Sequence, residues 1–265
     1  MKIIGIMVLK NEELWLKNVI ENVIEFCDKL IILDNNSDDM TWEIIRKMQN
    51  QSSKIFSYKI KSMAESHSYI SGYAGTNTWV FGVDGDELYD PIGLQKLKKE
   101  LNSGKYNHIW NIKGNVLHCI SIDRTKKIGI GYLAPPSRSI TKLYNFSIIN
   151  KWDKCPERLH SGQLIFSDTY TNETFKIKNK FDWDESHFRC LHLCFIKRSN
   201  IFINKSRLNP AEIMVSKKYF LFRIFKKFRL DVINRTIIRV MGSTYKKNNY
   251  SSGELQKKLI NQFIS

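Results

Sequence analysis

The sequence has few cysteines and prolines, no internal repeat and no long uncharged apolar run. Its five cysteines are odd in number and irregularly spaced, which does not fit a disulfide framework. Five prolines and thirteen glycines argue against a low-complexity or disordered chain. No uncharged stretch reaches the roughly 18 residues that a membrane span needs, and no secretory signal is recognisable. These absences predict a globular, cytoplasmic protein.

The chain is strongly basic. Its formal net charge is +16 and its pI is near 9.6, while 42% of its residues are hydrophobic. Such a chain has enough apolar side chains for a core and should seek a polyanion: nucleic acid, anionic lipid or a phosphorylated small molecule. No nucleic-acid-binding motif is present, so we expect no nucleic-acid partner.

Strands and helices alternate over the first hundred residues. Apolar runs predict strands, and helical spacing of apolar residues predicts helices between them. The strands are expected at 2–9, 29–33, 54–60 and 78–83, and the helices at 12–26, 41–49, 63–74 and 92–102. Alternation with short connections predicts an α/β fold, with a parallel sheet flanked by helices.

The pattern is weaker after residue 105. Strands are expected within 107–117, 139–146, 162–166 and 189–196. The Gly-, Pro- and Lys-rich stretch 125–139 is expected to be a mobile loop. If a diphosphate binds nearby, Lys126 and Lys127 of this loop would be able to close over it.

Three carboxylates follow the strand at 78–83. Asp84 and Asp86 lie two residues apart, so on extended backbone they face the same side, and Glu87 follows. Ionised carboxylates are costly to bury unless they are paired or bound to metal. This arrangement suits a hard divalent cation that bridges to a phosphate-bearing ligand. A solvated acidic turn is the alternative.

Polar clusters also follow the first two strands. They are Lys10-Asn11-Glu12 and Asp34 to Asp39. Because ligands of parallel sheets bind beyond the carboxyl ends of the strands, we expect all three clusters to converge on one crevice.

The first hundred residues resemble glycosyltransferases of family 2, which have the GT-A fold. The resemblance is carried in order by Lys10-Asn11-Glu12-Glu13, by Asp34-Asn35-Asn36-Ser37-Asp38-Asp39, and by Trp79 to Glu87 in the place of the family's DxD motif. The remainder matches only loosely. The resemblance implies a Rossmann-like, mixed but mainly parallel sheet, and transfer of a sugar from a nucleotide donor, with a UDP-sugar favoured.

Site residues follow from the resemblance. It implies that Asp86 binds Mn²⁺ or Mg²⁺ directly, and that Asp84, at the same metal site, contacts the ribose or a metal-bound water. It also implies that Asp34 lies under the uracil or ribose. The remaining nucleotide-sugar-binding residues are expected to be Lys10, Asn11, Glu12, Asn36, Ser37, Asp39, His67 and Gly85.

Many enzymes of this fold supply a late histidine as a further metal ligand, and His192 is expected to fill that position. The alternatives are a buried structural histidine, or a zinc site formed by His187, Cys190, His192 and Cys194. For His67 the alternative is a surface residue, the commoner situation of a lone histidine.

An inverting enzyme needs a carboxylate base for the acceptor hydroxyl. Glu157 is the favoured base, with Asp153 and Asp184 behind it. A surface ion pair between Glu157 and Arg158 is the competing interpretation. We expect an inverting, hexosyltransferase-like enzyme.

The tail from residue 216 is basic and amphipathic. Residues 216–247 hold ten Lys or Arg and one Asp. Between 220 and 232 the apolar and basic side chains fall on opposite helical faces. This predicts a helix on an anionic membrane surface through 216–241, with packing on the domain or nucleic-acid binding as alternatives. We expect a catalytic domain over 1–205, with a nucleotide-sugar half 1–104 and an acceptor half 105–205, followed by a basic helical extension over 206–265.

The sequence therefore predicts a glycosyltransferase of surface-polysaccharide synthesis (capsule, O-antigen or lipooligosaccharide). It would act on a glycan or lipid-linked acceptor and be peripheral on the inner face of the cell membrane. The alternatives are a sugar-nucleotide pyrophosphorylase, and a non-catalytic basic module that binds membrane or nucleic acid.

Overall fold

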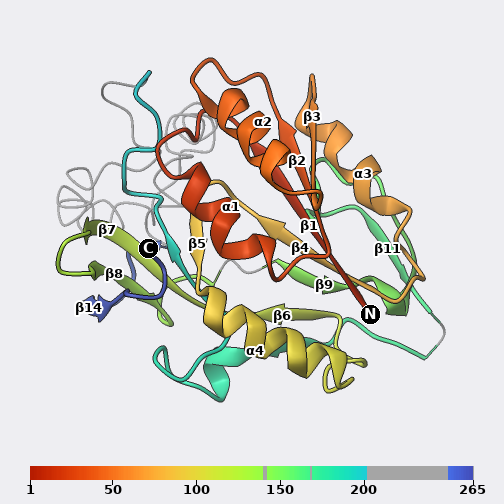
Figure 1. The fold of residues 1–265 in the computed structure, drawn as a ribbon. Helices are drawn as coiled ribbons and strands as arrows, with labels where there is room; N and C mark the ends of the chain where they lie inside the picture. The colour runs from red at the N-terminus through yellow and green to blue at the C-terminus, as the bar shows by residue number, and fades with distance from the viewer. Residues whose placement is uncertain (140–141, 168, 202–249, 265) are drawn as a thin grey trace, which may run out of the picture.

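A seven-stranded sheet forms the centre of the protein (Figure 1). The computed structural model describes residues 1–139, 142–167, 169–201 and 250–264. The strand order is β12-β6-β9-β4-β1-β2-β3. Four neighbouring strands are parallel: β1 (Lys2–Leu9), β2 (Lys29–Asp34), β3 (Ile55–Lys59) and β4 (Thr78–Val83). The others are β6 (Asn111–Lys113), β9 (Leu143–Asn145), antiparallel to β4 and β6, and β12 (Thr174–Lys176), parallel to β6. The predicted mixed, mainly parallel α/β sheet is confirmed.

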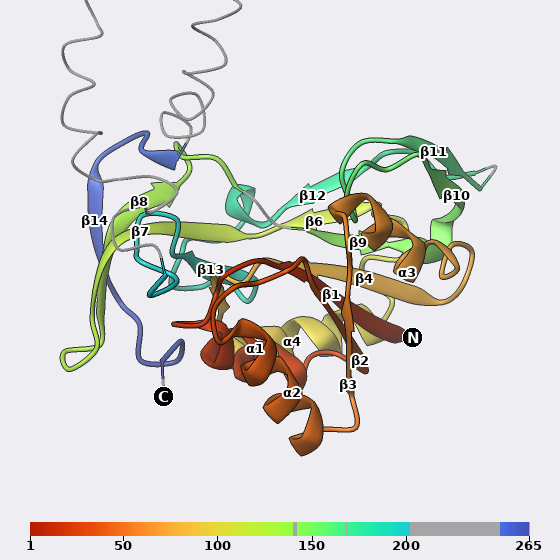
Figure 2. The same ribbon diagram turned by 90° about the horizontal axis from the view of Figure 1, so that it is seen from above.

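Both faces of this sheet are buried. Along β1, Ile3 and Met7 belong to one core cluster, whereas Ile4 and Ile6 belong to a second. Figure 2 shows α1, α2 and α4 together on one side of β1 and β4. The helices are α1 (Leu16–Ile24), α2 (Thr41–Gln51), α3 (Ser68–Ser71) and α4 (Pro91–Asn102), with 3₁₀ turns η1 (Met63–His67), η2 (Phe146–Ile148) and η3 (Ile177–Asn179). Burial on both faces explains why these strands are continuous apolar runs.

A second sheet continues from the acidic cluster. Its order is β14-β8-β7-β13-β5. The strands are β5 (Glu87–Tyr89), β7 (Asn115–Asp123), β8 (Ile128–Ala134), β13 (Arg189–His192) and β14 (Leu255–Leu259). A separate hairpin joins β10 (Ile149–Asp153) to β11 (Gln163–Phe166). Because β5 begins one residue after Asp86, the acidic cluster connects the two sheets.

The prediction of a mobile loop over 125–139 is wrong. Residues 128–134 form β8, which pairs with β7 on one side and β14 on the other. Glycine here permits close strand packing, since a Cβ at Gly131 would lie 2.2 Å from the carbonyl oxygen of His118. Lys126 forms an ion pair with Asp123, and the Lys127 ammonium donates to the carbonyl of Ile264, so neither lysine is placed by these contacts over the acidic cluster.

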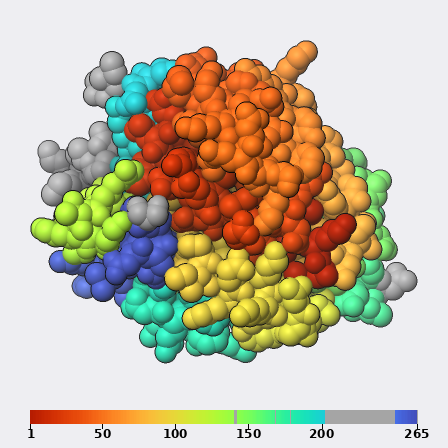
Figure 3. All heavy atoms as spheres, in the orientation of Figure 1, coloured from red at the N-terminus to blue at the C-terminus, as the bar shows by residue number. Residues whose placement is uncertain are grey.

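The predicted C-terminal extension is described only at its end. There, residues 255–259 form a strand of the second sheet rather than a helix. Figure 3 shows these blue residues packed against the yellow-green hairpin of β7 and β8. The predicted membrane-binding segment 216–241 lies outside the described residues. Of the helices that the structure describes, none has the length and apolar character needed to cross a bilayer.

Phe81 tests the packing of the first sheet. Its ring is fully buried and lies 4.8 Å from Tyr89, 5.3 Å from Phe26 and 5.9 Å from Phe188 between centroids. Phe81→Ala leaves a cavity, so the free energy of unfolding should fall by about 3–5 kcal/mol in urea titrations. The control Ile92→Ala, at a side chain that is 60% exposed, should change it by about 0.5 kcal/mol or less. Equal effects of the two substitutions would contradict the described core.

Candidate active site

The carboxyl ends of β1, β2 and β4 meet at one edge of the first sheet. In the parallel register Leu9 lies opposite Asp34, and Met7 lies opposite Val83. The residues that follow each strand are therefore neighbours, and the predicted convergence of the three polar clusters is confirmed.

The loops after β1 and β2 hold each other in place. Asn11 donates its backbone N–H to the Ser37 hydroxyl at 3.0 Å, and its side-chain oxygen accepts from the Asp38 N–H at 2.8 Å. One oxygen of Asp34 accepts from the Ser37 N–H at 3.3 Å. The other Asp34 oxygen and the Asn11 side-chain nitrogen are buried without a hydrogen-bond partner. Unpaired buried polar atoms are costly, so this acceptor and this donor are the atoms of the corner that hydrogen bonds to a ligand would satisfy.

The structure also shows where the other residues predicted for this corner lie. Asp39 accepts the N–H of Thr41, the first residue of α2, at 3.0 Å, whereas Lys10 is exposed. Asn36 has a left-handed backbone, with φ of 53°. The Glu12 N–H donates to the Thr41 hydroxyl at 2.8 Å, which ties the start of α2 to the loop after β1.

Asp84 lies between two cations. Its carboxylate forms ion pairs with Lys142 and with Arg158, whose Nη2 is 2.6 Å from Oδ1. Partial burial works against ionisation of Asp84, but the two cations outweigh it and hold the pKa of this carboxyl well below its ordinary value. Arg158 also donates to the carbonyl of Val83 at 3.1 Å. Asp84 is therefore fixed as an anion at the end of β4.

Asp86 lies between a cation and an imidazole. Its carboxylate is 3.2 Å from Nη1 of Arg198, which also pairs with Glu12. The Nε2 atom of His192 is 3.8 Å from Oδ2 of Asp86. Antiparallel pairing of β5 with β13 places Glu87 opposite His192, and the Leu193 N–H donates to the Asp86 carbonyl at 2.8 Å. The strand pairing therefore brings the predicted late histidine to the DxD carboxylates.

Glu87 is completely buried beneath this pair. One of its oxygens accepts from the Asp84 N–H and from the Tyr89 hydroxyl, each at 3.1 Å. Burial raises the pKa of Glu87 to about 8, against the opposing influence of the Lys142 ammonium. Glu87 thereby fixes the backbone of the acidic turn.

The residues at this edge fit a divalent cation. Asp86 offers carboxylate oxygen, and His192 offers a neutral imidazole, since burial lowers the pKa of this histidine. Carboxylate with imidazole is a donor set for Mn²⁺, and the 3.8 Å separation is short enough for one ion to bind both. A second group of possible ligands consists of His118, His192 and Cys194, whose donor atoms lie within 4.8 Å of one another. That group contains neither His187 nor Cys190, so the zinc combination considered from the sequence is not assembled.

The three predicted base residues lie in different places. Glu157 accepts from Arg158 at 2.8 Å, and its side chain is 26% exposed. Because Arg158 also pairs with Asp84, Glu157 is linked to the acidic cluster through one guanidinium. Asp153 forms an ion pair with Lys151 at 2.5 Å.

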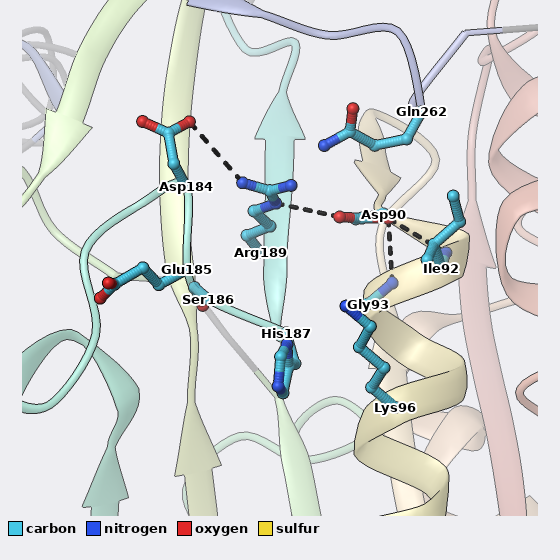
Figure 4. Close-up of a pocket in the computed structure, with 10 residues that line it drawn as sticks. All are labelled: Asp90, Ile92, Gly93, Lys96, Asp184, Glu185, Ser186, His187, Arg189 and Gln262. Carbon is cyan, nitrogen blue, oxygen red and sulfur yellow. Dashed lines mark hydrogen bonds and ion pairs between the residues drawn. The ribbon is translucent and has the colours of Figure 1, made fainter.

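Asp184 belongs to a different region. It borders a cavity of about 460 Å³ beside the start of α4, together with Arg189, His187 and Gln262 (Figure 4). Arg189 begins β13 and His192 ends it, so at about 3.3 Å per residue the cavity lies roughly 10 Å along the strand from the DxD residues. Asp90 caps α4 there through the N–H groups of Ile92 and Gly93 and pairs with Arg189 at 3.0 Å.

His67 supports the loop that carries Glu157. Its two ring nitrogens lie 2.5 Å from the carbonyl oxygens of Trp152 and Arg158. Ser66 accepts the Arg158 N–H at 2.8 Å. The contacts of His67 are therefore with this loop, behind the ion pair of Arg158 with Asp84.

Lys142, Arg198 and His118 were not identified from the sequence. Each stands alone in its local stretch, with no motif around it. The convergence of Lys142, Arg158 and Arg198 on the acidic cluster depends on hydrogen-bonded ion pairs between residues 58 to 186 positions apart in the sequence.

The gathering of carboxylates and unpaired polar atoms at the carboxyl edge of a mainly parallel sheet places them where open α/β folds bind their ligands. The family model "Glycosyl transferase family 2" matches residues 6–201. The chain therefore belongs to this family. No curated protein matches the sequence significantly.

Parts of several solved structures are similar to part of this chain. TarS residues 1–349 from S. aureus has 14% identity and a TM-score of 0.40, with 56% of this chain and 48% of that chain covered. A mannosyltransferase from Pyrobaculum calidifontis, in complex with GDP-Man and Mn²⁺, has 16% identity, a TM-score of 0.33 and coverages of 47% and 36%. Glucosyl-3-phosphoglycerate synthase from Mycobacterium tuberculosis, with Mn²⁺ and UDP-glucose, has 21% identity, a TM-score of 0.30 and coverages of 44% and 43%. The matched part spans less than half the length of each of these proteins.

Gly85 tests the close packing of the acidic turn. A Cβ at this position would lie 2.6 Å from Cγ of Glu12 and 2.8 Å from Cδ2 of Leu9. Gly85→Ala should push the loops after β1 and β4 apart and weaken nucleotide affinity by about tenfold or more in calorimetric titrations. The control Gly72→Ala meets nothing within 4 Å and should leave that affinity unchanged. Unaltered affinity in Gly85→Ala would show that nucleotide does not bind against this turn.

Proposed function

We propose that the chain transfers a hexose from a nucleoside-diphosphate sugar, with UDP favoured, to a glycan or lipid-linked acceptor in surface-polysaccharide synthesis. The observation that carries the proposal is the gathering of Asp84, Asp86 and His192 next to the unpaired atoms of Asn11 and Asp34. Of the three interpretations that the sequence allowed, the family match corresponds to this one.

The nucleoside would bind at the edge formed by β1 and β2. The bare acceptor on Asp34 and the donor on Asn11 are complementary to the edge of a pyrimidine or to ribose hydroxyls. Ser37 and Asp38 hold these two side chains in place before the ligand arrives. Such preorganisation lowers the entropic cost of binding.

The diphosphate would lie over the acidic cluster. A Mn²⁺ or Mg²⁺ ion held by Asp86 and His192, with Asp84 beside it, would supply positive charge to the leaving nucleoside diphosphate. Lys142, Arg158 and Arg198 add fixed positive charge at the same edge. Their charges favour the oxygens on which negative charge develops as the glycosidic bond breaks.

Glu157 is the proposed base for an inverting transfer. Its carboxylate is half-buried and held by Arg158, which also binds Asp84. The arrangement fixes Glu157 near the donor edge, where it could accept the proton of the acceptor hydroxyl.

Asp86→Asn tests the metal-assisted function. The wild-type protein should gain about 2.7 kcal/mol of stability at a UDP concentration 100 times its Kd, and this gain should require Mn²⁺. Asp86→Asn removes one carboxylate charge without changing the side-chain shape, so it should lose most of the Mn²⁺-dependent rise in Tm. Sugar transfer should fall by about 10²-fold or more.

Asp123→Asn is the matched control. Asp123 is exposed and pairs with Lys126 in the turn after β7, so its substitution should alter neither the rise in Tm nor transfer. A wild-type protein that responds to no nucleoside diphosphate with Mn²⁺ would contradict the proposed donor. Full transfer by Asp86→Asn would contradict the role of Asp86.

We further propose that residues 216–241 hold the enzyme on the inner face of the cell membrane. The support is the amphipathic pattern of basic and aromatic residues in the sequence. Each basic residue near an anionic surface contributes on the order of 1 kcal/mol. Replacing Arg223, Lys226, Lys227 and Arg229 by Gln should therefore reduce co-sedimentation with phosphatidylglycerol-rich vesicles by about 10²-fold or more.

The matched control neutralises four exposed lysines of the described domain, including Lys47 and Lys61. It removes the same net charge and should retain vesicle binding. If the two variants lose equal affinity, binding follows net charge alone and the segment has no special role.

A further inference from the structure

Two histidines stand side by side behind the acidic cluster. His118 on β7 and His192 on β13 are partners in the parallel register of these strands. Their rings are 5.0 Å apart at 75°, and their Nδ1 atoms are 2.8 Å apart. His118 is completely buried and His192 is 6% exposed. The short distance means that one Nδ1 carries a proton and the other accepts it.

The carbonyl of Arg138 decides which nitrogen carries the proton. Nε2 of His118 lies 2.8 Å from this carbonyl oxygen. A carbonyl oxygen can only accept, so Nε2 of His118 must carry a proton. Among the described residues no carboxylate contacts His118, and a buried imidazolium without a counter-charge is costly. Neutral His118 therefore has a bare Nδ1, and this atom accepts from Nδ1–H of His192.

The same reasoning fixes the second ring. With its proton on Nδ1, neutral His192 has a bare lone pair on Nε2. This is the atom that lies 3.8 Å from Oδ2 of Asp86. An imidazole binds a metal ion through an unprotonated nitrogen, and a hydrogen bond at the other nitrogen selects which one that is.

We propose that His118 is a positioning residue that holds His192 in the Nδ1-protonated tautomer, with its bare Nε2 directed at Asp86 as a ligand for the divalent cation. The inference rests on the proposed metal-assisted function and adds to it a chain of hydrogen bonds, the relay. The relay runs from the Arg138 carbonyl through His118 and His192 to the cation site.

The packing around the relay keeps both rings in place. Tyr250 stacks on His118, with centroids 4.6 Å apart at 27°, and meets His192 edge-on at 5.1 Å. Ser137 donates its hydroxyl toward the carbonyl of Tyr250 at 2.9 Å. A third residue, Cys194, lies close enough to complete a separate metal-ligand group with the two histidines. However, both Nδ1 atoms are already used in their shared hydrogen bond, which favours the relay over such a site.

The tautomer of His192 can be measured directly. In metal-free protein with ¹⁵N-labelled histidine, the His192 ring should show a protonated Nδ1 and an unprotonated Nε2. The signals are assigned by their loss in His192→Gln. Addition of Mg²⁺ with UDP should shift the Nε2 signal of His192. A protonated Nε2 on His192 in the metal-free protein would overturn the proposal without any variant of His118.

Two substitutions at His118 distinguish a role as hydrogen-bond acceptor for His192 from a role in packing alone. His118→Phe keeps a ring against Tyr250 but removes the acceptor. His118→Asn places its side-chain oxygen where Nδ1 of His118 was and so keeps the acceptor. Both lose the hydrogen bond to Arg138, so they differ in the acceptor offered to His192. Mn²⁺ affinity, measured by electron paramagnetic resonance, should fall about 10- to 100-fold in His118→Phe and remain within about threefold of wild type in His118→Asn.

The outcomes distinguish this inference from the proposed function. If the wild type binds no Mn²⁺ in the presence of UDP, the metal-assisted function fails. If the wild type binds Mn²⁺ and His118→Phe binds it equally well, the positioning role alone fails. Equal loss in both variants would assign His118 to packing and would also overturn the relay.

Discussion

The compensation of buried carboxylates at the end of β4 determines how the rest of the molecule is arranged. Asp84 and Asp86 need positive partners because isolated charges are unstable in a largely desolvated site. Lys142, Arg158 and Arg198 supply them from three segments that are far apart in the chain. Removing one partner of a buried ion pair typically costs about 3–5 kcal/mol. The requirement for charge balance therefore ties the segments that carry Lys142, Arg158 and Arg198 to the carboxyl edge of the first sheet.

The first hundred residues could be predicted closely because their signals are local. The expected strands at 2–9 and 78–83 coincide with β1 and β4. The polar clusters after these strands could be placed at one edge because parallel pairing leaves no other arrangement. His192 could be proposed as a ligand from the resemblance to a family, and strand pairing with β5 explains why it lies beside Asp86.

Beyond residue 105 the fold is determined by contacts between residues far apart in the sequence, and local sequence patterns do not indicate such contacts. Lys142 and Arg198 have no distinguishing neighbours, and their roles arise only where the chain folds back on the acidic cluster. Glycine is frequent in loops, but it also permits two strands to pack closely. The glycines of β8 therefore fit either structure, and only the partner strand decides between the two. His118 gains its role from its register partner on β13.

The return of the C-terminal residues to the second sheet has a consequence for protein engineering. Residues up to 201 and from 250 onward are both anchored in the described domain: β14 pairs with β8, and Tyr250 packs on the histidine pair. Residues 250–264 are therefore part of the described domain. Truncation after residue 201 would remove an edge strand of the second sheet and the aromatic ring that packs on the histidine pair. A variant designed to alter residues 202–249 should therefore retain residues 250–264.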